Sequence, residues 1–303
     1  MSYTYLTDLI NELFGTDIHL PIAMFGTFVG LAIIVAVYLV QREVQRFEKL
    51  GLISGIKGNS AKLIGDLAMV AVLFGVMGAK LFDVIERPAD LFNDPIDAIF
   101  SSGGFSIYGG LIFGFLAGVI FLKKRSIPIV PMLDAVAPAL ILSYGIGRLG
   151  CQISGDGDWG VAADMSLKPE WLPEWFWAQT YENNALGVVI NSPGVYPTPL
   201  YEALMSFCIF IFLWSVRRRQ QAVGQLFFIY LILSGLERIL IEKIRINQEY
   251  SFWGINATQA EIISVFLVAS GLIGFLKLSK SRYIPKLIFS LFVMGALTAC
   301  ATC

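Results

Sequence analysis

The chain has 303 residues, of which 56% are hydrophobic and 15% are charged, and its formal net charge is −1. In soluble domains about a quarter of all residues are charged, so this composition excludes an ordinary soluble protein. The near-zero net charge also argues against nucleic acid as a partner, which would require a basic surface. The chain has one histidine and four cysteines without zinc-type spacing. We therefore expect neither a metal site nor another cofactor.

The apolar residues lie in continuous blocks of the length that crosses a bilayer as a helix, about 20 residues. Backbone groups cannot stay unpaired in lipid, so these blocks predict an all-α, polytopic transmembrane bundle. Residues 4–14 precede them and predict a short amphipathic helix on the membrane surface. The seven predicted spans are residues 21–41, 63–86, 106–122, 129–150, 198–216, 222–245 and 256–276, and a shorter apolar segment follows at 287–299. We place the membrane domain at 1–280 and a separate tail at 281–303.

The distribution of lysine and arginine sets the predicted orientation. Most of the 22 basic residues lie in the connections after the first, third, fifth and seventh spans. The opposite connections hold only Arg87 and Lys168. By the positive-inside rule, the N-terminus is external and the long loop 151–197 is external as well. We expect a multi-pass protein of the bacterial plasma (inner) membrane.

Charged residues within the predicted spans indicate a functional site. An arginine at mid-membrane costs roughly 2.5–3.5 kcal/mol even on the lenient insertion scale, so it is kept for a partner or a ligand. Arg238, Glu242 and Arg245 are spaced i, i+4, i+7 and are predicted to share one helix face. Arg148 lies where the fourth span ends in glycines. Two arginines near the outer leaflet predict a site for a lipid phosphate. A purely structural ion-pair stripe is the alternative.

A glycine-rich motif, SSGGFSIYGGLIFG, occupies residues 101–114 at the entrance of the third span. Gly109 and Gly110 permit close approach of a neighbouring helix, which is the structural interpretation of the motif. Tyr108 would present a hydroxyl at head-group depth, or it belongs to an aromatic belt at the membrane interface.

Six short motifs occur in order along the apolar part of the chain. They are YGGLIFG at 108–114, LDAVAP at 133–138, GRLG at 147–150, YPTPLYE at 196–202, ERILIEKIR at 237–245 and ATQAEIIS at 257–264. Together they resemble the motifs of the prolipoprotein diacylglyceryl transferases, over residues 20–278. The resemblance implies transfer of diacylglycerol from phosphatidylglycerol to the lipobox cysteine thiol of prolipoprotein signal peptides, with formation of a thioether at the outer face of the membrane.

The resemblance also implies roles for individual residues. Arg148 and Arg238 would hold the head-group phosphate and reduce the charge that develops on it as it leaves. Glu242 and Arg245 would support these arginines, and Glu202 would belong to the same pocket.

Further residues are candidates for substrate contact and acid–base chemistry. Gly109 and Gly110 are expected among the substrate-binding residues. Tyr108 and Asp156 are expected among the catalytic residues, and Asp158 is a further acid–base candidate. They would remove the proton of the acceptor thiol, whose ordinary pKa is about 8.5.

One segment departs from the family pattern, so alternative functions have to be considered. After GRLG the family usually has Asn-Phe-x-Asn-x-Glu, whereas this chain has Cys151 to Asp156 in the order CQISGD. A family-shaped lipid-binding protein without transferase activity is therefore one alternative. A transporter or channel with a charge-lined pathway is another, although no inverted repeat is found.

The C-terminal segment 281–300 reads SRYIPKLIFSLFVMGALTAC. Basic residues precede an apolar run from Leu287 to Ala299 that is too short for an ordinary span, an arrangement typical of a secretory signal. The final LTAC also resembles a lipobox. We hypothesise that this tail is a tethered substrate or mimic in which Cys300 is modified. An eighth helix is the alternative.

Overall fold

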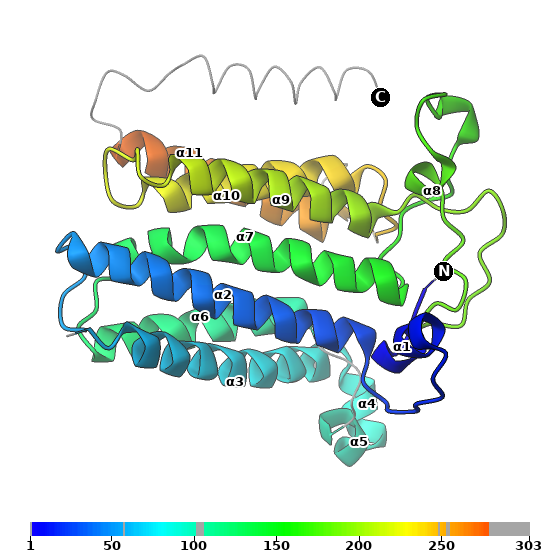
Figure 1. Cartoon of the computed structure of the whole chain (residues 1–303), viewed down its shortest axis with the longest axis horizontal. Helices are drawn as coiled ribbons and strands as arrows, with labels where there is room; N and C mark the ends of the chain where they lie inside the picture. The colour runs from blue at the N-terminus through cyan, green and yellow to red at the C-terminus, as the bar shows by residue number, and fades with distance from the viewer. Residues whose placement is uncertain (1, 57, 101–105, 248, 253–254, 279–303) are drawn as a thin grey trace. The chain divides into compact units, whose positions relative to one another are not determined.

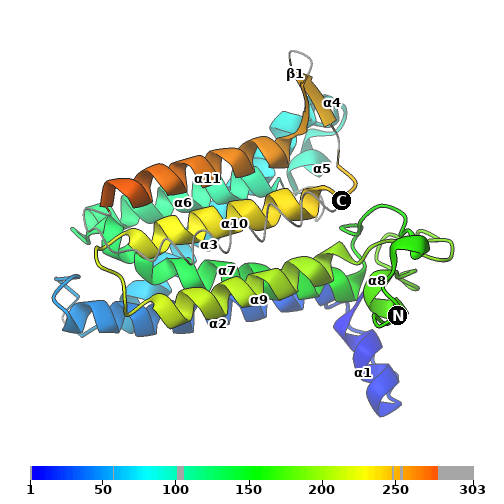
Figure 2. The same cartoon turned by 90° about the horizontal axis from the view of Figure 1, so that it is seen from above.

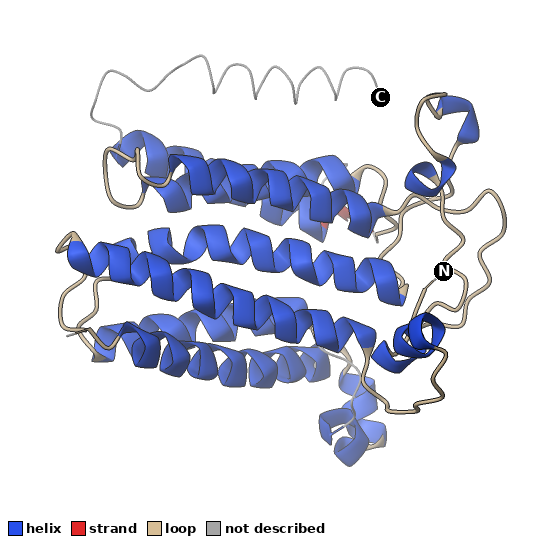
Figure 3. Cartoon of the chain, viewed as in Figure 1, coloured by secondary structure: helices blue, strands red, loops and turns tan. Residues whose placement is uncertain are grey.

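A computed structural model describes residues 2–56, 58–100, 106–247, 249–252 and 255–278 (Figure 1). The chain divides into two compact units, one of Met1–Ala36 with Ala137–Cys303 and one of Val37–Val136. The described residues are mainly helical (Figure 3). The predicted tail at 281–303 lies outside the described residues.

Within the part of the chain that the structure describes, five helices are long and apolar enough to cross a membrane. Each coincides with one of the seven predicted spans. They are α2 (Met24–Lys49), α3 (Ser60–Glu86), α7 (Ile129–Ser154), α9 (Thr198–Val216) and α11 (Gln259–Leu278). The composition confirms a polytopic, helical membrane protein, whereas the number seven stays a prediction.

Two shorter helices occupy the remaining predicted spans. They are α6 (Ile107–Lys124) and α10 (Gln225–Glu242). In α10, three charged residues, Glu237, Arg238 and Glu242, interrupt the apolar sequence. Its composition is therefore less apolar than that of a simple lipid-facing span, which agrees with a helix that carries polar side chains into a protein interior.

The N-terminal amphipathic helix is present as α1 (Leu6–Phe14). The Asp8 carboxylate accepts the backbone N–H of Tyr5 at 2.9 Å, which satisfies a donor at the helix start. Gly15 ends the helix in the left-handed region, at φ 62°, a conformation that glycine adopts without steric cost.

In the first unit, α10 packs against both α9 and α11 (Figure 2). The approach to α11 is close because Gly235 and Gly271 have no side chains. A Cβ atom at either glycine would lie 2.9 Å from a backbone oxygen of the opposite helix. Helix α7 contacts side chains of α9 at Gly145, where a Cβ would lie 3.0 Å from the Ser206 Cβ.

Shorter elements complete the described chain. A hairpin of strands β1 and β2, which the sequence did not predict, connects the end of α10 with the start of α11. The remaining elements are α4 (Pro88–Asn93), α5 (Pro95–Phe100), a 3₁₀ turn at Met165–Leu167, α8 (Glu174–Trp177), β1 (Glu249–Phe252) and β2 (Ile255–Thr258).

In the second unit, Gly109, Gly110 and Gly114 of the glycine-rich motif lie at the contact between α3 and α6. A Cβ at Gly78 would lie 2.6 Å from the Gly109 carbonyl oxygen, and one at Gly110 would lie 3.5 Å from the Gly75 oxygen. The structural interpretation of these glycines is therefore confirmed, since they let two helix backbones approach.

Replacing Gly109 by alanine is expected to destabilise the protein by about 1–3 kcal/mol, because the new Cβ overlaps the Gly78 backbone. Unfolding in a titration with SDS, followed by circular dichroism, measures the change. Gly65→Ala is the matched control, because a Cβ at Gly65 in α3 meets nothing within 4 Å. It should leave stability unchanged or raise it by up to about 1 kcal/mol. Equal stability of both variants would contradict the packing role.

Candidate active site

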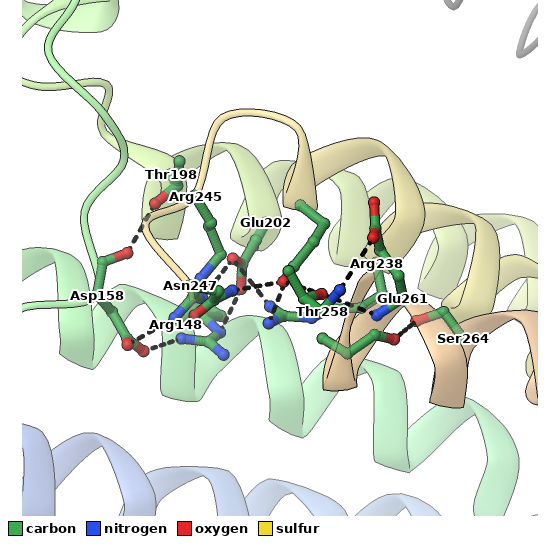
Figure 4. Close-up of polar contacts among 12 residues, drawn as sticks. Arg148, Asp158, Thr198, Glu202, Arg238, Arg245, Asn247, Thr258, Glu261 and Ser264 are labelled. Atoms are coloured by element: carbon green, nitrogen blue, oxygen red, sulfur yellow. Dashed lines mark hydrogen bonds and ion pairs between the residues drawn. The ribbon is translucent and has the colours of Figure 1, made fainter. Parts of the chain in front are cut away.

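The centre of the site is Glu202, a fully buried carboxylate in the second turn of α9. Its two oxygens lie 2.5 Å from Arg148 Nε and 2.8 Å from Arg245 Nη1 (Figure 4). Arg238 Nη1 lies 3.6 Å from the same carboxylate. The Tyr144 hydroxyl donates a further hydrogen bond of 2.6 Å. One buried acid thus brings Arg148 together with Arg238 and Arg245, which lie about ninety residues further along the chain. This pairing offsets the cost of burying a charged carboxylate.

A second carboxylate, Asp158, joins two of these arginines from the loop that follows α7. It forms an ion pair with Arg148 and another, of 2.7 Å, with Arg245 Nη2. The Thr198 hydroxyl donates to the Asp158 carbonyl oxygen at 2.7 Å and fixes the loop to the start of α9. Burial alone would raise the pKa of the Asp158 carboxyl, but the Arg148 and Arg245 guanidiniums outweigh it and hold that pKa below its ordinary value.

The backbone conformation that brings Arg245 into the site was not predicted from the sequence. Helix α10 ends at Glu242, so the prediction of one helix face extending to Arg245 is wrong. The chain turns and forms an isolated antiparallel bridge between Gly160 and Arg245. The Val161 N–H donates to the Ile244 carbonyl at 2.9 Å. This backbone pairing with the loop directs the guanidinium toward Glu202 and Asp158.

Glu242 and Arg238 form the second half of the site. Arg238 Nη2 lies 3.0 Å from Glu242 Oε2. The other Glu242 oxygen accepts hydrogen bonds of 2.6 Å from Asn247 and from the Thr258 hydroxyl. Thr258 and Glu261 cap α11 reciprocally, each accepting the other's backbone N–H at 3.1 Å. The start of α11 therefore fixes the position of Glu242, and through it that of Arg238.

The three arginines differ in how many donors they have left. Arg245 uses both terminal nitrogens on Glu202 and Asp158, while its buried Nε has no hydrogen-bond partner among the described residues. Arg238 keeps a buried Nη1 that has no hydrogen-bond partner among the described residues. Its side chain is also the most accessible of the three, with 21% of its surface exposed against 9% for Arg245. Arg238 is therefore the arginine best placed to receive an anion.

Asp156 and Cys151 lie beside Arg148. The Cys151 sulfur is 3.9 Å from Arg148 Nη1, and Asp156 accepts the Asp158 backbone N–H at 3.4 Å. Burial raises the pKa of the Asp156 carboxyl above its ordinary value. Ligand atoms of Cys151, Asp156 and Asp158 lie within 4.8 Å of one another, a spacing that a metal ion could use. The Arg148 guanidinium already provides positive charge there, and it disfavours a second cation.

The structure brings together Arg148, Glu202, Arg238, Glu242 and Arg245, as predicted, and adds residues that sequence reasoning did not single out. These additions are Tyr144, Cys151, Thr198, Glu237, Asn247 and Thr258.

The glycine-rich motif belongs to the second unit. Tyr108 lies in the first turn of α6, and Gly109 and Gly110 contact α3. That these three residues contact the substrate stays a prediction.

The fold and the site define a membrane protein with several apolar helices and a buried cluster of arginines and carboxylates suited to an anionic group. The chain belongs to the family described as prolipoprotein diacylglyceryl transferase, whose model matches residues 13–277.

Three relatives share the name phosphatidylglycerol–prolipoprotein diacylglyceryl transferase. One from Corynebacterium glutamicum is 30% identical over 277 residues, which cover 88% of this chain and 82% of the relative. One from Clostridium tetani is 27% identical, with coverage of 88% and 96%. One from Staphylococcus aureus is 28% identical, with coverage of 88% of both chains.

Proposed function

We propose that this chain transfers the diacylglyceryl group of phosphatidylglycerol to a cysteine thiol of prolipoprotein signal peptides. The observation that supports the proposal most directly is the cluster around Glu202, in which Arg238 has an open, buried donor beside Arg148. The family and the names of the relatives agree with this chemistry.

In the proposed reaction, the acceptor sulfur attacks the glyceryl carbon, a C–S bond forms and the C–O bond to phosphate breaks. Glycerol phosphate leaves with the electron pair of that bond. Arg148 and Arg238 stabilise the negative charge that develops on the leaving phosphate. The thiol proton passes to a base and finally to the phosphate or solvent. Asp156 and Tyr108 are the proposed acid–base residues, and Gly109 and Gly110 are proposed to contact the lipid.

Purified protein in liposomes of phosphatidylglycerol, with a prolipoprotein signal peptide, tests the proposal. Release of glycerol phosphate together with a peptide heavier by one diacylglyceryl group is the expected result. Solute flux without peptide modification would instead identify a transporter. Lipid binding with neither activity would identify a binding protein of the same family.

We propose further that all seven apolar segments span the bacterial plasma membrane, with the N-terminus and the loop 151–197 outside. In a chain whose four cysteines are replaced by serine, single cysteines are introduced at two exposed positions. Val189, 86% exposed, and Leu50, 60% exposed, lie in loops predicted to be on opposite sides. A membrane-impermeant maleimide should label Val189→Cys in intact cells and should label Leu50→Cys only after permeabilisation. The reverse pattern would place the arginine cluster on the cytoplasmic side.

The tail at 281–303 is proposed to carry a substrate-like cysteine, Cys300. It follows residues 13–277, the part of the chain that matches the family. Mass spectrometry of protein from its native membrane should find a diacylglyceryl adduct on Cys300. The adduct should be absent from Cys300→Ser, and from Arg238→Ala in a cell without another transferase. An unmodified thiol in an active enzyme would contradict the proposal. Tethering would raise the local thiol concentration to roughly millimolar.

A further inference from the structure

Glu237 is a buried acid that the proposed mechanism does not use. It lies in α10 immediately before Arg238, and only 4% of its surface is exposed. Its Oε1 atom is buried and makes no hydrogen bond within the part of the chain that the structure describes. Buried polar atoms are nearly always hydrogen-bonded, so an open carboxyl oxygen at this depth calls for a donor.

The surroundings of Glu237 belong to the active site. Its carboxyl lies within electrostatic range of Glu202 and of the three arginines, Arg148, Arg238 and Arg245. The neighbouring residue, Arg238, has the open donor Nη1. Two consecutive residues of one helix therefore contribute a buried acceptor and a buried donor beside the Glu202 cluster. Such a pair suits a ligand that has an anionic oxygen and, a few bonds away, a hydroxyl group.

The charges in the cluster show that Glu237 is not needed for ion pairing. Arg148, Arg238 and Arg245 are paired with Glu202, Glu242 and Asp158. These six groups balance without Glu237, and no ion pair to Glu237 is found among the described residues. A hydroxyl group can donate a hydrogen bond to the open oxygen of Glu237 without adding charge to the cluster. A further cation would add charge.

We propose that the Glu237 carboxyl accepts a hydrogen bond from a hydroxyl of the glycerol head group while Arg238 holds the adjacent phosphate. This assignment rests on the proposed function, and it makes Glu237 a determinant of lipid specificity. Phosphatidylglycerol is then selected over phospholipids with the same phosphate and no hydroxyl, because such a lipid leaves the buried carboxyl unsatisfied.

The test compares two lipid donors in the same assay, phosphatidylglycerol and phosphatidylpropanol, which lacks both head-group hydroxyls. The wild-type chain should prefer phosphatidylglycerol by about tenfold or more in kcat/KM. Glu237→Leu, which keeps the side-chain bulk and removes the acceptor, should reduce this preference to about threefold or less, mainly by raising KM for phosphatidylglycerol. Glu237→Gln keeps a carbonyl acceptor and should retain an intermediate preference.

Glu43→Gln is the matched control, since Glu43 is a buried acid with 3% exposure that pairs with Arg46 in the other unit. It should affect both lipids equally. If Glu237→Leu also lowers both activities by the same factor, Glu237 is structural and the assignment is overturned. Equal use of both lipids by the wild-type chain would overturn it as well. Absence of transfer from either lipid by the wild-type chain would instead refute the proposed function.

Discussion

Replacing Arg238 by alanine is expected to lower kcat/KM for phosphatidylglycerol at least a hundredfold while the protein stays folded. Loss of one group that stabilises developing charge typically costs about 10²–10³ in rate. The change leaves the buried Glu242 without its ion-pair partner and so lowers stability, but Glu202 keeps its contacts with Arg148 and Arg245. Glu242 likewise keeps its hydrogen bonds from Asn247 and Thr258. Arg238→Lys should recover only part of the activity, since an ammonium group cannot form the fork of two hydrogen bonds.

Two comparisons isolate this effect. Lys243→Ala, which removes a 62% exposed side chain paired with Glu261, should leave turnover within about twofold of wild type. Arg148→Ala should abolish activity but also reduce stability, because Arg148 pairs with both Glu202 and Asp158. Activity is measured at matched membrane levels, with the folded fraction determined in parallel. Near-normal turnover of Arg238→Ala would refute its role in holding the phosphate.

The sequence predicted which residues belong to the cluster, but it did not predict the backbone conformation that brings Arg245 into it. Arg148, Glu202 and Arg238 were identified because charged residues within apolar segments are costly and their motifs resemble a known family. The end of α10 was predicted wrongly. The chain continues as Lys243-Ile244-Arg245-Ile246 without glycine or proline, so no local signal marks the helix end.

The contacts that end α10 are long-range, and periodicity does not report them. The helix stops where the chain pairs with the loop at Gly160, more than eighty residues earlier. Asp158 and Thr258 reach the cluster by the same kind of contact, from a loop and from a helix cap. Residue spacing predicts which side chains share a helix face, but it does not predict which loop folds onto that face.

Glu202→Gln is expected to reduce the free energy of unfolding by about 3–5 kcal/mol, the largest loss of stability among the variants considered. Removing one partner of a buried ion pair leaves the other charge uncompensated. Here the fully buried Glu202 carboxylate forms ion pairs with Arg148, Arg245 and Arg238. The neutral amide accepts hydrogen bonds but cannot balance three guanidiniums. Unfolding in SDS, followed by circular dichroism, measures the loss.

A double variant separates charge balance around Glu202 from packing. If stability depends on balanced charge around Glu202, then Arg245→Gln added to Glu202→Gln should cost less than the sum of the two single variants, with a coupling of about 1–3 kcal/mol. Arg245 is the suitable partner because both of its terminal nitrogens are used within the cluster. Asp66→Asn, at a partly exposed pair with Arg125 in the other unit, is the control and should change stability by no more than about 0.5 kcal/mol. Strictly additive losses would show that Glu202 stabilises the bundle by packing rather than by pairing with the arginines.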